Sequence, residues 1–336
     1  MPVYDDLMAF NVWGSRAPML PALLTSVIAL MVLSWSSDRF VTGAAGLSLK
    51  LGLSPALVGL TLVAFGTSAP EILVSATAAL SDSSALAVAN ALGSNIANMG
   101  LVLALTLLWR PVPCPQDSRH QVLSVCLLVT ALAGVVLIDG RLTRVDGVLL
   151  LAGLTVLAVA TWKRKALMEA PPRDNPEGGR GRDLLLFLGG LVLLLISARA
   201  LVWGATEVAR QLGVGEALIG LTLVALGTSL PELATCLAAT RRGHGELALG
   251  NVLGSNILNL LMVLPMPALL GPGRLADPAL LDRDYTAVVL LTLVMALGMM
   301  LAVRRPLGRG TGLALLAGYG VYLMVLWRGL QATSGV

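Results

Sequence analysis

The chain has 336 residues, of which 56% are hydrophobic and 12% charged, and its mean hydropathy is +0.84. Soluble domains contain roughly 25% charged residues, so this composition excludes a water-soluble globular protein and predicts an integral membrane protein. The formal net charge of +4 does not indicate a nucleic-acid-binding protein, because the basic residues follow the predicted loops and form no single patch.

Apolar runs long enough to cross a bilayer, about 20 residues each, follow one another along the chain. The first half contains five, near residues 18–36, 39–80, 84–108, 120–138 and 145–162, and the second half contains five more, near 183–199, 200–239, 246–270, 285–303 and 312–327. The second run of each half is too long for one straight helix, so we predict that it is broken. The sequence therefore predicts an all-α membrane protein with ten transmembrane helices.

Residues 163–182 separate the two halves and are rich in Pro, Gly and charge, which favours a flexible linker. We predict a first unit over residues 1–162 and a second over 183–336. The segment before residue 18 contains Asp5 and Asp6 and lacks the basic start and cleavage site of a secretory signal, so we expect it to be retained and exposed.

Lys and Arg are distributed unequally between the two sides of the predicted membrane. If the N-terminus is outside, the inner loops contain fourteen of these residues and the outer loops seven. The positive-inside rule favours this orientation, with the linker in the cytoplasm. The compact chain without a targeting segment favours a bacterial inner membrane.

The strongest signal is an internal repeat. GLTLVAFGTSAP (59–70) and GLTLVALGTSLP (220–231) are identical at ten of twelve positions, and NALGSNIAN (90–98) matches NVLGSNILN (251–259) at the same offset of 161 residues. Each half is predicted to cross the membrane five times, an odd number, so the second half must be inverted relative to the first. Inverted repeats of this kind are typical of secondary transporters, and they place equivalent residues together near the midplane.

Each copy of the first motif ends in proline and glutamate. Pro70 and Pro231 cannot donate a backbone hydrogen bond, so we predict that the helix breaks there. Irregular backbone at membrane depth is tolerated only where it is buried in protein or lines a wet cavity. A carboxylate near the bilayer centre costs at least about 2.5–3.5 kcal/mol on insertion scales, so we interpret Glu71 and Glu232 as functional.

Helical spacing places further oxygen atoms near the two glutamates. Taken singly, small polar residues in membrane helices more often serve packing than ligand binding, but here the whole set is repeated. An oxygen-only set suits hard cations, and its size suits the roughly 6–8 ligands of Ca²⁺. The candidate ligands besides the glutamates are Thr67, Thr228, Ser68, Ser229, Ser94, Ser255, Asn98, Asn259 and the backbone carbonyls of Ala64 and Ala225, which we expect the breaks to free.

The two segments, GLTLVAFGTSAPE to GSNIAN and GLTLVALGTSLPE to GSNILN, resemble the paired alpha-repeats of the calcium/cation antiporter superfamily, and most resemble its prokaryotic sodium/calcium exchangers. The resemblance is dense over about forty residues in each half and weak elsewhere. It implies ten helices in two inverted repeats of five, with broken helices at the ion site. It also implies an antiporter rather than an enzyme, and sliding of the first helix of each half over the rest of the bundle.

The resemblance further implies a division of the ligands. Calcium would be held by Glu71, Glu232, Thr67 and Thr228, and sodium by those glutamates with Ser68, Ser229, Ser94, Ser255 and the carbonyls of Ala64 and Ala225, while Asn98 and Asn259 close the centre. Ca²⁺ and Na⁺ would then be transported ions, with no cofactor. The expected partners are inorganic cations and the lipid bilayer, with no nucleic acid and no obligate protein partner.

Two positions depart from the family pattern. Some relatives have Asp at the position of Asn259, an acid associated with potassium dependence, so asparagine here argues against potassium co-transport. Ala89 stands where the second copy has Gly250, and we expect this difference to have little consequence.

The closest alternative is a proton/calcium antiporter, since glutamates also bind protons, but the repeated Ser and Asn residues favour sodium. A channel would need a continuous pore, whereas inverted repeats favour a carrier. A membrane enzyme or a purely structural bundle is a third alternative, although no repeated His, Cys nucleophile or phosphate loop supports catalysis.

Overall fold

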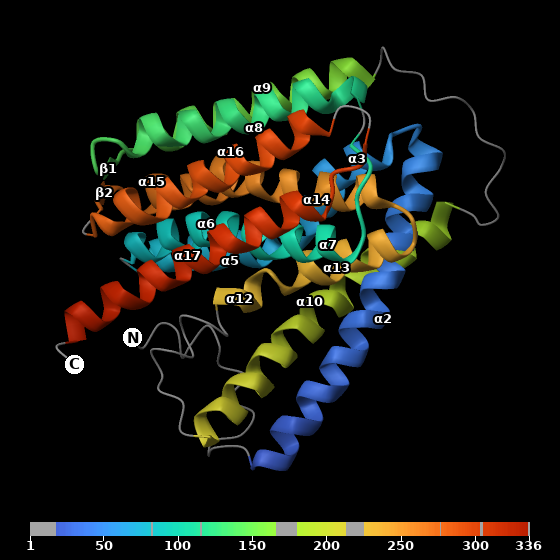
Figure 1. Ribbon diagram of the computed structural model, residues 1–336, viewed down its shortest axis with the longest axis horizontal. Coiled ribbons are helices and arrows are strands. Elements are labelled where there is room, and N and C mark those ends of the chain that lie inside the picture. Colours follow the sequence, from blue (N-terminus) through green and yellow to red (C-terminus); the bar gives the residue numbers. More distant parts are fainter. Residues whose placement is uncertain are drawn as a thin grey trace.

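The computed structural model describes residues 18–81, 83–114, 116–165, 180–212, 225–275, 277–302 and 305–334, which are mostly helical (Figure 1). Segments labelled η are π-helical. The first half contains α2 (Met19–Leu51), α3 (Pro55–Val58), η1 (Gly59–Val63), α4 (Ala64–Thr67), α5 (Ala69–Leu80), α6 (Ser84–Ala97), η2 (Asn98–Leu103), α7 (Ala104–Trp109), α8 (Gln116–Leu137), β1 (Arg141–Leu142) and α9 (Arg144–Lys165). The second half contains α10 (Arg180–Gln211), α12 (Ala225–Thr228), α13 (Leu230–Arg241), α14 (Gly245–Leu258), η4 (Asn259–Val263), α15 (Pro265–Leu270), β2 (Gly273–Arg274), η5 (Leu280–Tyr285), α16 (Thr286–Leu301) and α17 (Arg309–Ser334).

Eight helices of the described chain are long and apolar enough to cross a membrane, and the bent pair Pro55–Thr67 and Ala69–Leu80 brings the number to nine. The tenth predicted span would include residues 213–224, which lie outside the described residues. Ten spans and the inversion of the two halves therefore stay predictions. The helices α9 and α10 extend into both ends of the predicted linker, whose residues 166–179 also lie outside the description.

The predicted boundary between the first two helices is wrong. Instead of ending near residue 36, α2 continues to Leu51 and is 33 residues long, and Gly52 ends it in the left-handed conformation with φ 62°. Polar residues at the predicted boundary are accommodated within the helix, because Ser36 and Ser37 each donate a hydrogen bond to a carbonyl three residues earlier. The boundary predicted near residue 199 is wrong in the same way, since α10 continues to Gln211.

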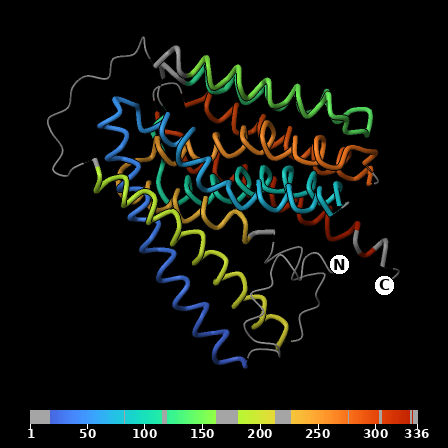
Figure 2. The backbone as a smooth tube through the Cα atoms, turned by 180° about the vertical axis from the view of Figure 1, so that it is seen from behind, coloured from blue at the N-terminus to red at the C-terminus, as the bar shows by residue number. Residues whose placement is uncertain are grey.

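The long helices α2 and α10 form a pair that lies at a steep angle to the other helices (Figures 1 and 2). The two helices approach closely at Gly190, which has no side chain. A Cβ there would lie 2.5 Å from the backbone nitrogen of Phe40. The rings of Phe40 and Phe187 are 4.9 Å apart, and Lys50 Nζ lies 2.5 Å from Asp183 Oδ2. The contacts of this pair with the rest of the bundle include two ion pairs of Asp38 in α2, with Arg241 and Arg242.

Helix α14 of the second half lies almost backbone to backbone against the broken helix of the first half. A Cβ at Gly250 would lie 2.3 Å from the carbonyl oxygen of Ala56, and one at Gly254 would lie 2.3 Å from that of Leu60. Atoms cannot approach so closely, so both positions require glycine. This contact fixes the first broken helix against the motif of the other half.

Short backbone pairings join the loops at the two ends of the bundle. At one end β1 pairs antiparallel with β2, with Leu142 opposite Gly273, and we call this end the β face. Ser84, at the start of α6, donates to the Gly271 carbonyl there at 2.6 Å. At the opposite end Val112 forms an isolated bridge with Leu307.

Candidate cation site

The two repeated glutamates occupy equivalent places, each in the first turn of a helix that follows a break. Glu71 belongs to α5 and Glu232 to α13, and their exposed fractions are 1% and 0%. The residues at the breaks, Ser68 and Ser229, have nearly the same backbone angles, φ −83°, ψ 5° and φ −88°, ψ 2°. The bend at the first break is 45°. Each carboxylate therefore lies at the N-terminal end of its helix, where backbone N–H groups carry a partial positive charge.

A hydroxyl group of the first half contacts the glutamate of the second half. Ser68 of the first half donates to Glu232 Oε1 at 3.3 Å, and Ser255 donates to the same oxygen at 3.4 Å. The carboxylates of Glu71 and Glu232 lie close enough for their charges to interact. The two motifs, separated by 161 residues, thus meet at one place.

Several of the predicted ligands have buried polar atoms without a hydrogen-bonding partner. Among the described residues twelve such side-chain atoms occur, and seven belong to predicted ligands: both carboxylate oxygens of Glu71, both amide atoms of Asn98, Glu232 Oε2, Ser229 Oγ and Asn259 Oδ1. Native proteins satisfy most buried polar groups, so each exception requires an explanation. Six of these seven atoms are oxygens, and a bound cation would satisfy them.

Asn98 and Asn259 mark equivalent irregularities, since η2 begins at one and η4 at the other. Asn259 donates its amide to Asn95 Oδ1 at 3.0 Å, and Asn95 donates in turn to the carbonyl of Asn256 at 3.2 Å. Asn259 is thereby held with its own amide oxygen unpaired, whereas neither amide atom of Asn98 has a partner among the described residues. The two halves differ at this point.

The expected release of the Ala64 carbonyl is wrong in part. This oxygen still accepts the backbone N–H of Ser68 at 2.9 Å. Proline removes the donor four residues beyond a carbonyl, and for Pro70 that carbonyl belongs to Gly66 rather than to Ala64. The Ala64 oxygen also accepts the Thr67 hydroxyl at 3.4 Å, so the Ala64 carbonyl can bind a cation only if the Thr67 hydroxyl turns away. Ala225 is the first residue of α12.

Two asparagines that the sequence prediction did not single out form hydrogen bonds with predicted ligands or with the backbone beside them. Asn251 accepts a hydrogen bond from Thr67 Oγ1 at 3.2 Å. Its counterpart Asn90 donates to the carbonyl of Glu71 at 3.1 Å and to Ser75 at 2.9 Å. Both asparagines begin the motif N-x-L-G-S-N and are themselves repeated at the offset of 161, so the same signal that identified the ligands also contained them.

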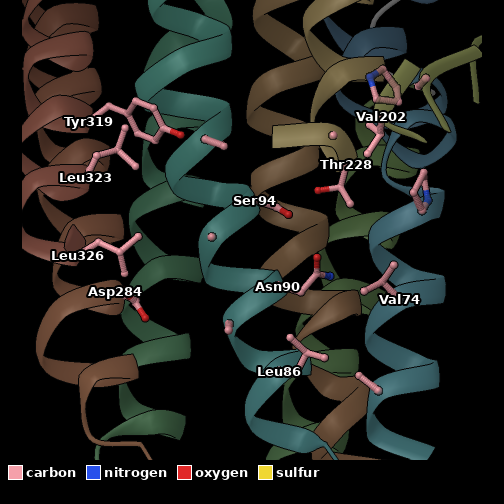
Figure 3. A pocket seen from close by; sticks show the side chains of 18 of the residues that line it. Val74, Leu86, Asn90, Ser94, Val202, Thr228, Asp284, Tyr319, Leu323 and Leu326 are labelled. Atoms are coloured by element: carbon pink, nitrogen blue, oxygen red, sulfur yellow. The ribbon is translucent and has the colours of Figure 1, made fainter. Parts of the chain in front are cut away.

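A cavity of about 300 Å³ adjoins the site (Figure 3). Its lining includes Leu86, two residues from Ser84 at the β face. Two predicted ligands, Ser94 and Thr228, line it together with Asn90. The close-up shows Tyr319, Leu323, Leu326 and Asp284 on the side formed by the last helices of the chain. Solvent and ions therefore have a route to one side of the site.

The described residues contain no group of three or more His, Cys, Asp or Glu that could hold a metal ion. The site instead combines two carboxylates with hydroxyl, amide and carbonyl oxygens, which are ligands for Na⁺ and Ca²⁺.

Comparisons with known proteins agree with this chemistry. The sequence profile described as "Sodium/calcium exchanger protein" matches residues 21–163 and 183–328. The chain is 39% identical over 319 residues to inner membrane protein YrbG of Escherichia coli, covering 92% of this chain and 98% of YrbG. It is 30% identical over 345 residues to sodium/calcium exchanger MaX1 of Methanosarcina acetivorans, covering 90% and 98%.

Solved structures give a similar result. A structure of the sodium-calcium exchanger NCX_Mj superimposes with a TM-score of 0.78 at 32% identity, and the match covers 91% of this chain and 99% of NCX_Mj. The match extends over nearly the whole of both chains, well beyond the repeated motifs.

Proposed function

The chain belongs to the sodium/calcium exchanger protein family, and from this premise we propose that it exchanges Na⁺ for Ca²⁺ by alternating access around Glu71 and Glu232. It is an integral membrane cation antiporter of a transporter family rather than an enzyme. The observation that supports the proposal is the number of buried oxygens without a hydrogen-bonding partner among the predicted ligands of the two repeats, which are in contact through Ser68 and Glu232.

The proposed ligands follow the groups already described. Ca²⁺ would bind Glu71 and Glu232 with the hydroxyls of Thr67 and Thr228. Na⁺ would bind the same glutamates with the hydroxyls and carbonyls of Ser68, Ser229, Ser94, Ser255, Ala64 and Ala225, while Asn98 and Asn259 complete the centre. Because Na⁺ and Ca²⁺ share the carboxylates, one ion displaces the other.

Charge balance explains why the exchange is obligatory. Two carboxylates give a formal charge of −2, which one Ca²⁺ or two Na⁺ neutralise. Moving the carboxylates through an apolar interior without a counter-ion costs several kcal/mol for each uncompensated charge. The unloaded carrier therefore rarely changes its conformation, and ions cross only in exchange.

The moving part would be the pair α2 and α10. Its steep angle to the other helices and its own internal contacts, Phe40 with Phe187 and Lys50 with Asp183, support movement as one body. The ion pairs of Asp38 with Arg241 and Arg242 would break and re-form as the pair slides over α13.

We also propose that the protein resides in a bacterial inner membrane with its N-terminus outside, which makes the β face the outer face. The relative YrbG is named an inner membrane protein. The excess of Lys and Arg in the loops predicted to lie inside supports this orientation.

Uptake under separate ion gradients tests the coupling ion. In proteoliposomes loaded with Na⁺, we expect external ⁴⁵Ca²⁺ to accumulate, and we expect no accumulation when K⁺ or a pH gradient replaces Na⁺. Uptake driven by the pH gradient and indifferent to Na⁺ would instead assign the protein to the proton/calcium class. Empty liposomes provide the background.

Asn95 should act through Asn259, because its side chain holds the Asn259 amide in place. We expect Asn95→Ala to raise the KM for Ca²⁺ up to about tenfold, the equivalent of one hydrogen bond of about 0.5–1.5 kcal/mol. The double variant N95A/N259A should be no worse than N259A alone, because the effect of Asn95 is exerted through the residue already removed. Initial rates of Ca²⁺ uptake at varied Ca²⁺ measure both.

The matched control is Asn256→Ala. Asn256 is the counterpart of Asn95 in the second half, but it contributes its backbone carbonyl to the network, and alanine retains that carbonyl. Its KM should stay close to that of the unaltered protein. Fully additive effects of N95A and N259A would show that Asn95 does not position Asn259.

A further inference from the structure

A second buried carboxylate lies in the membrane-spanning part, away from the proposed ion ligands. Asp284 is only 4% exposed and lies five residues into the apolar span Leu280–Leu301. Arg283 donates to its two carboxylate oxygens at 2.7 and 3.0 Å, and Tyr322 of α17 donates to one of them at 3.0 Å. Charged residues inside membrane spans are expensive and usually functional, so this cluster requires an explanation.

The local backbone is unusual at the same place. In the described chain η1, η2 and η4 all adjoin proposed ligands, and the remaining π-helical segment, η5, contains Arg283 and Asp284. Single π-helical turns frequently mark functional sites. The π-helical turn at η5 points to function near Arg283 and Asp284.

The cluster lines the cavity that reaches the ion site. Asp284 and Arg283 share that cavity with Ser94 and Thr228, and Figure 3 shows Asp284 on the wall formed by the last helices. Arg199 is the only other charged side chain among the described lining residues, and the titratable tyrosines there are Tyr319 and Tyr322. Without Asp284, two positive charges and no negative one would face ions in the cavity.

We propose that Asp284 is an access residue, which neutralises Arg283 and so lowers the positive potential that cations meet in the cavity at the β face on their way to Glu71 and Glu232. This inference rests on the proposed function, because it takes the cavity as a route of the transported ions. Charges lining a cleft set the local concentration of ions by their summed potential. Asp284 binds no ion itself in this account, since its oxygens are already paired.

The proposal predicts a dependence on ionic charge that a structural role would not produce. The energy of an ion in a potential is proportional to its charge, so the factor for Ca²⁺ is the square of that for Na⁺. We expect Asp284→Asn to raise the KM for Na⁺ about threefold and the KM for Ca²⁺ about tenfold, with kcat little changed. Added inert salt should reduce both effects by screening.

Three further variants make the experiment decisive. Arg283→Gln should lower the KM for Ca²⁺, because it leaves the cavity more negative, and R283Q/D284N should restore it, because the net charge returns to its original value. Asp282→Asn is the matched control: it removes the same charge two residues away, but Asp282 is exposed and does not belong to the described cavity lining. Its KM values should not change.

The measurements are initial rates of ⁴⁵Ca²⁺ uptake at pH 8, with ions added to everted or right-side-out membrane vesicles. Effects should occur only when the varied ion is applied at the β face. Equal changes in D284N and D282N, or the same direction of change in R283Q and D284N, would overturn the proposal. If D284N does not fold, the sign of the R283Q effect decides. Failure of the proposed function can be distinguished from failure of this inference, since the unaltered protein would then show no Na⁺-dependent Ca²⁺ uptake at all.

Discussion

Replacing Glu71 with Gln, or Glu232 with Gln, should reduce Na⁺-dependent ⁴⁵Ca²⁺ uptake to the background of empty vesicles. Glutamine preserves the shape of the side chain but removes half of the formal charge of −2 at the site. One remaining carboxylate cannot neutralise Ca²⁺, and a net positive charge in the apolar interior costs several kcal/mol. An energy of about 1.4 kcal/mol changes an equilibrium constant tenfold. A cost of several kcal/mol therefore places Ca²⁺ uptake below detection.

Both variants should still fold, because the buried carboxylate oxygens concerned are largely without partners in the protein. Size-exclusion profiles and thermal unfolding in detergent measure this. Glu246→Gln is the matched control, since Glu246 lies in the first turn of α14, outside the proposed ligands, and its uptake should be retained. Normal uptake by E71Q or E232Q would refute the assignment of that glutamate.

Adding one methyl group at Gly254 should inactivate the exchanger, whereas the same change at Gly93 should be tolerated. The two glycines are counterparts at the offset of 161 residues. A Cβ at Gly254 would lie 2.3 Å from the carbonyl oxygen of Leu60 and 2.7 Å from Cβ of Ala64, while a Cβ at Gly93 would meet no described atom within 4 Å. Only the first change forces the two halves apart.

Overpacking of a core costs about 1–3 kcal/mol, and here the obstructing atom is a backbone oxygen that cannot rotate away. We expect Gly254→Ala to displace α4 with Thr67 and to reduce uptake about a hundredfold, with a lower unfolding temperature. Gly93→Ala should keep both close to their original values, because Gly93 faces the cavity. Equal losses in both variants would contradict the packing described for α14.

Much of the site could be predicted because the motifs that contain the proposed ligands occur twice in the sequence. The break before Glu71 and the burial of both glutamates followed from the proline positions and the cost of a charge in the membrane, and the structure agrees. The helix boundary near residue 36 could not be predicted correctly, because the partners of polar residues there are set by tertiary structure. Asp38, for example, pairs with Arg241 more than 200 residues away.

The hydrogen-bond network around the ligands also could not be predicted from the sequence. A repeat predicts that equivalent residues play equivalent roles, but Asn259 is held by Asn95 whereas Asn98 has no corresponding partner in the described chain. Likewise Gly250 requires its glycine for close packing, while its counterpart Ala89 lines the cavity. Such differences follow from the packing of the two halves, which breaks the symmetry of the sequence.

Equilibrium binding of ⁴⁵Ca²⁺ to the purified protein tests most directly whether Glu71 and Glu232 form one cation site. We predict one Ca²⁺ bound per chain, displaced by Na⁺, and no specific binding by either E71Q or E232Q. Retention of the full stoichiometry after either substitution, or two independent Ca²⁺ sites of which each variant loses only one, would contradict a single site shared by the two repeats.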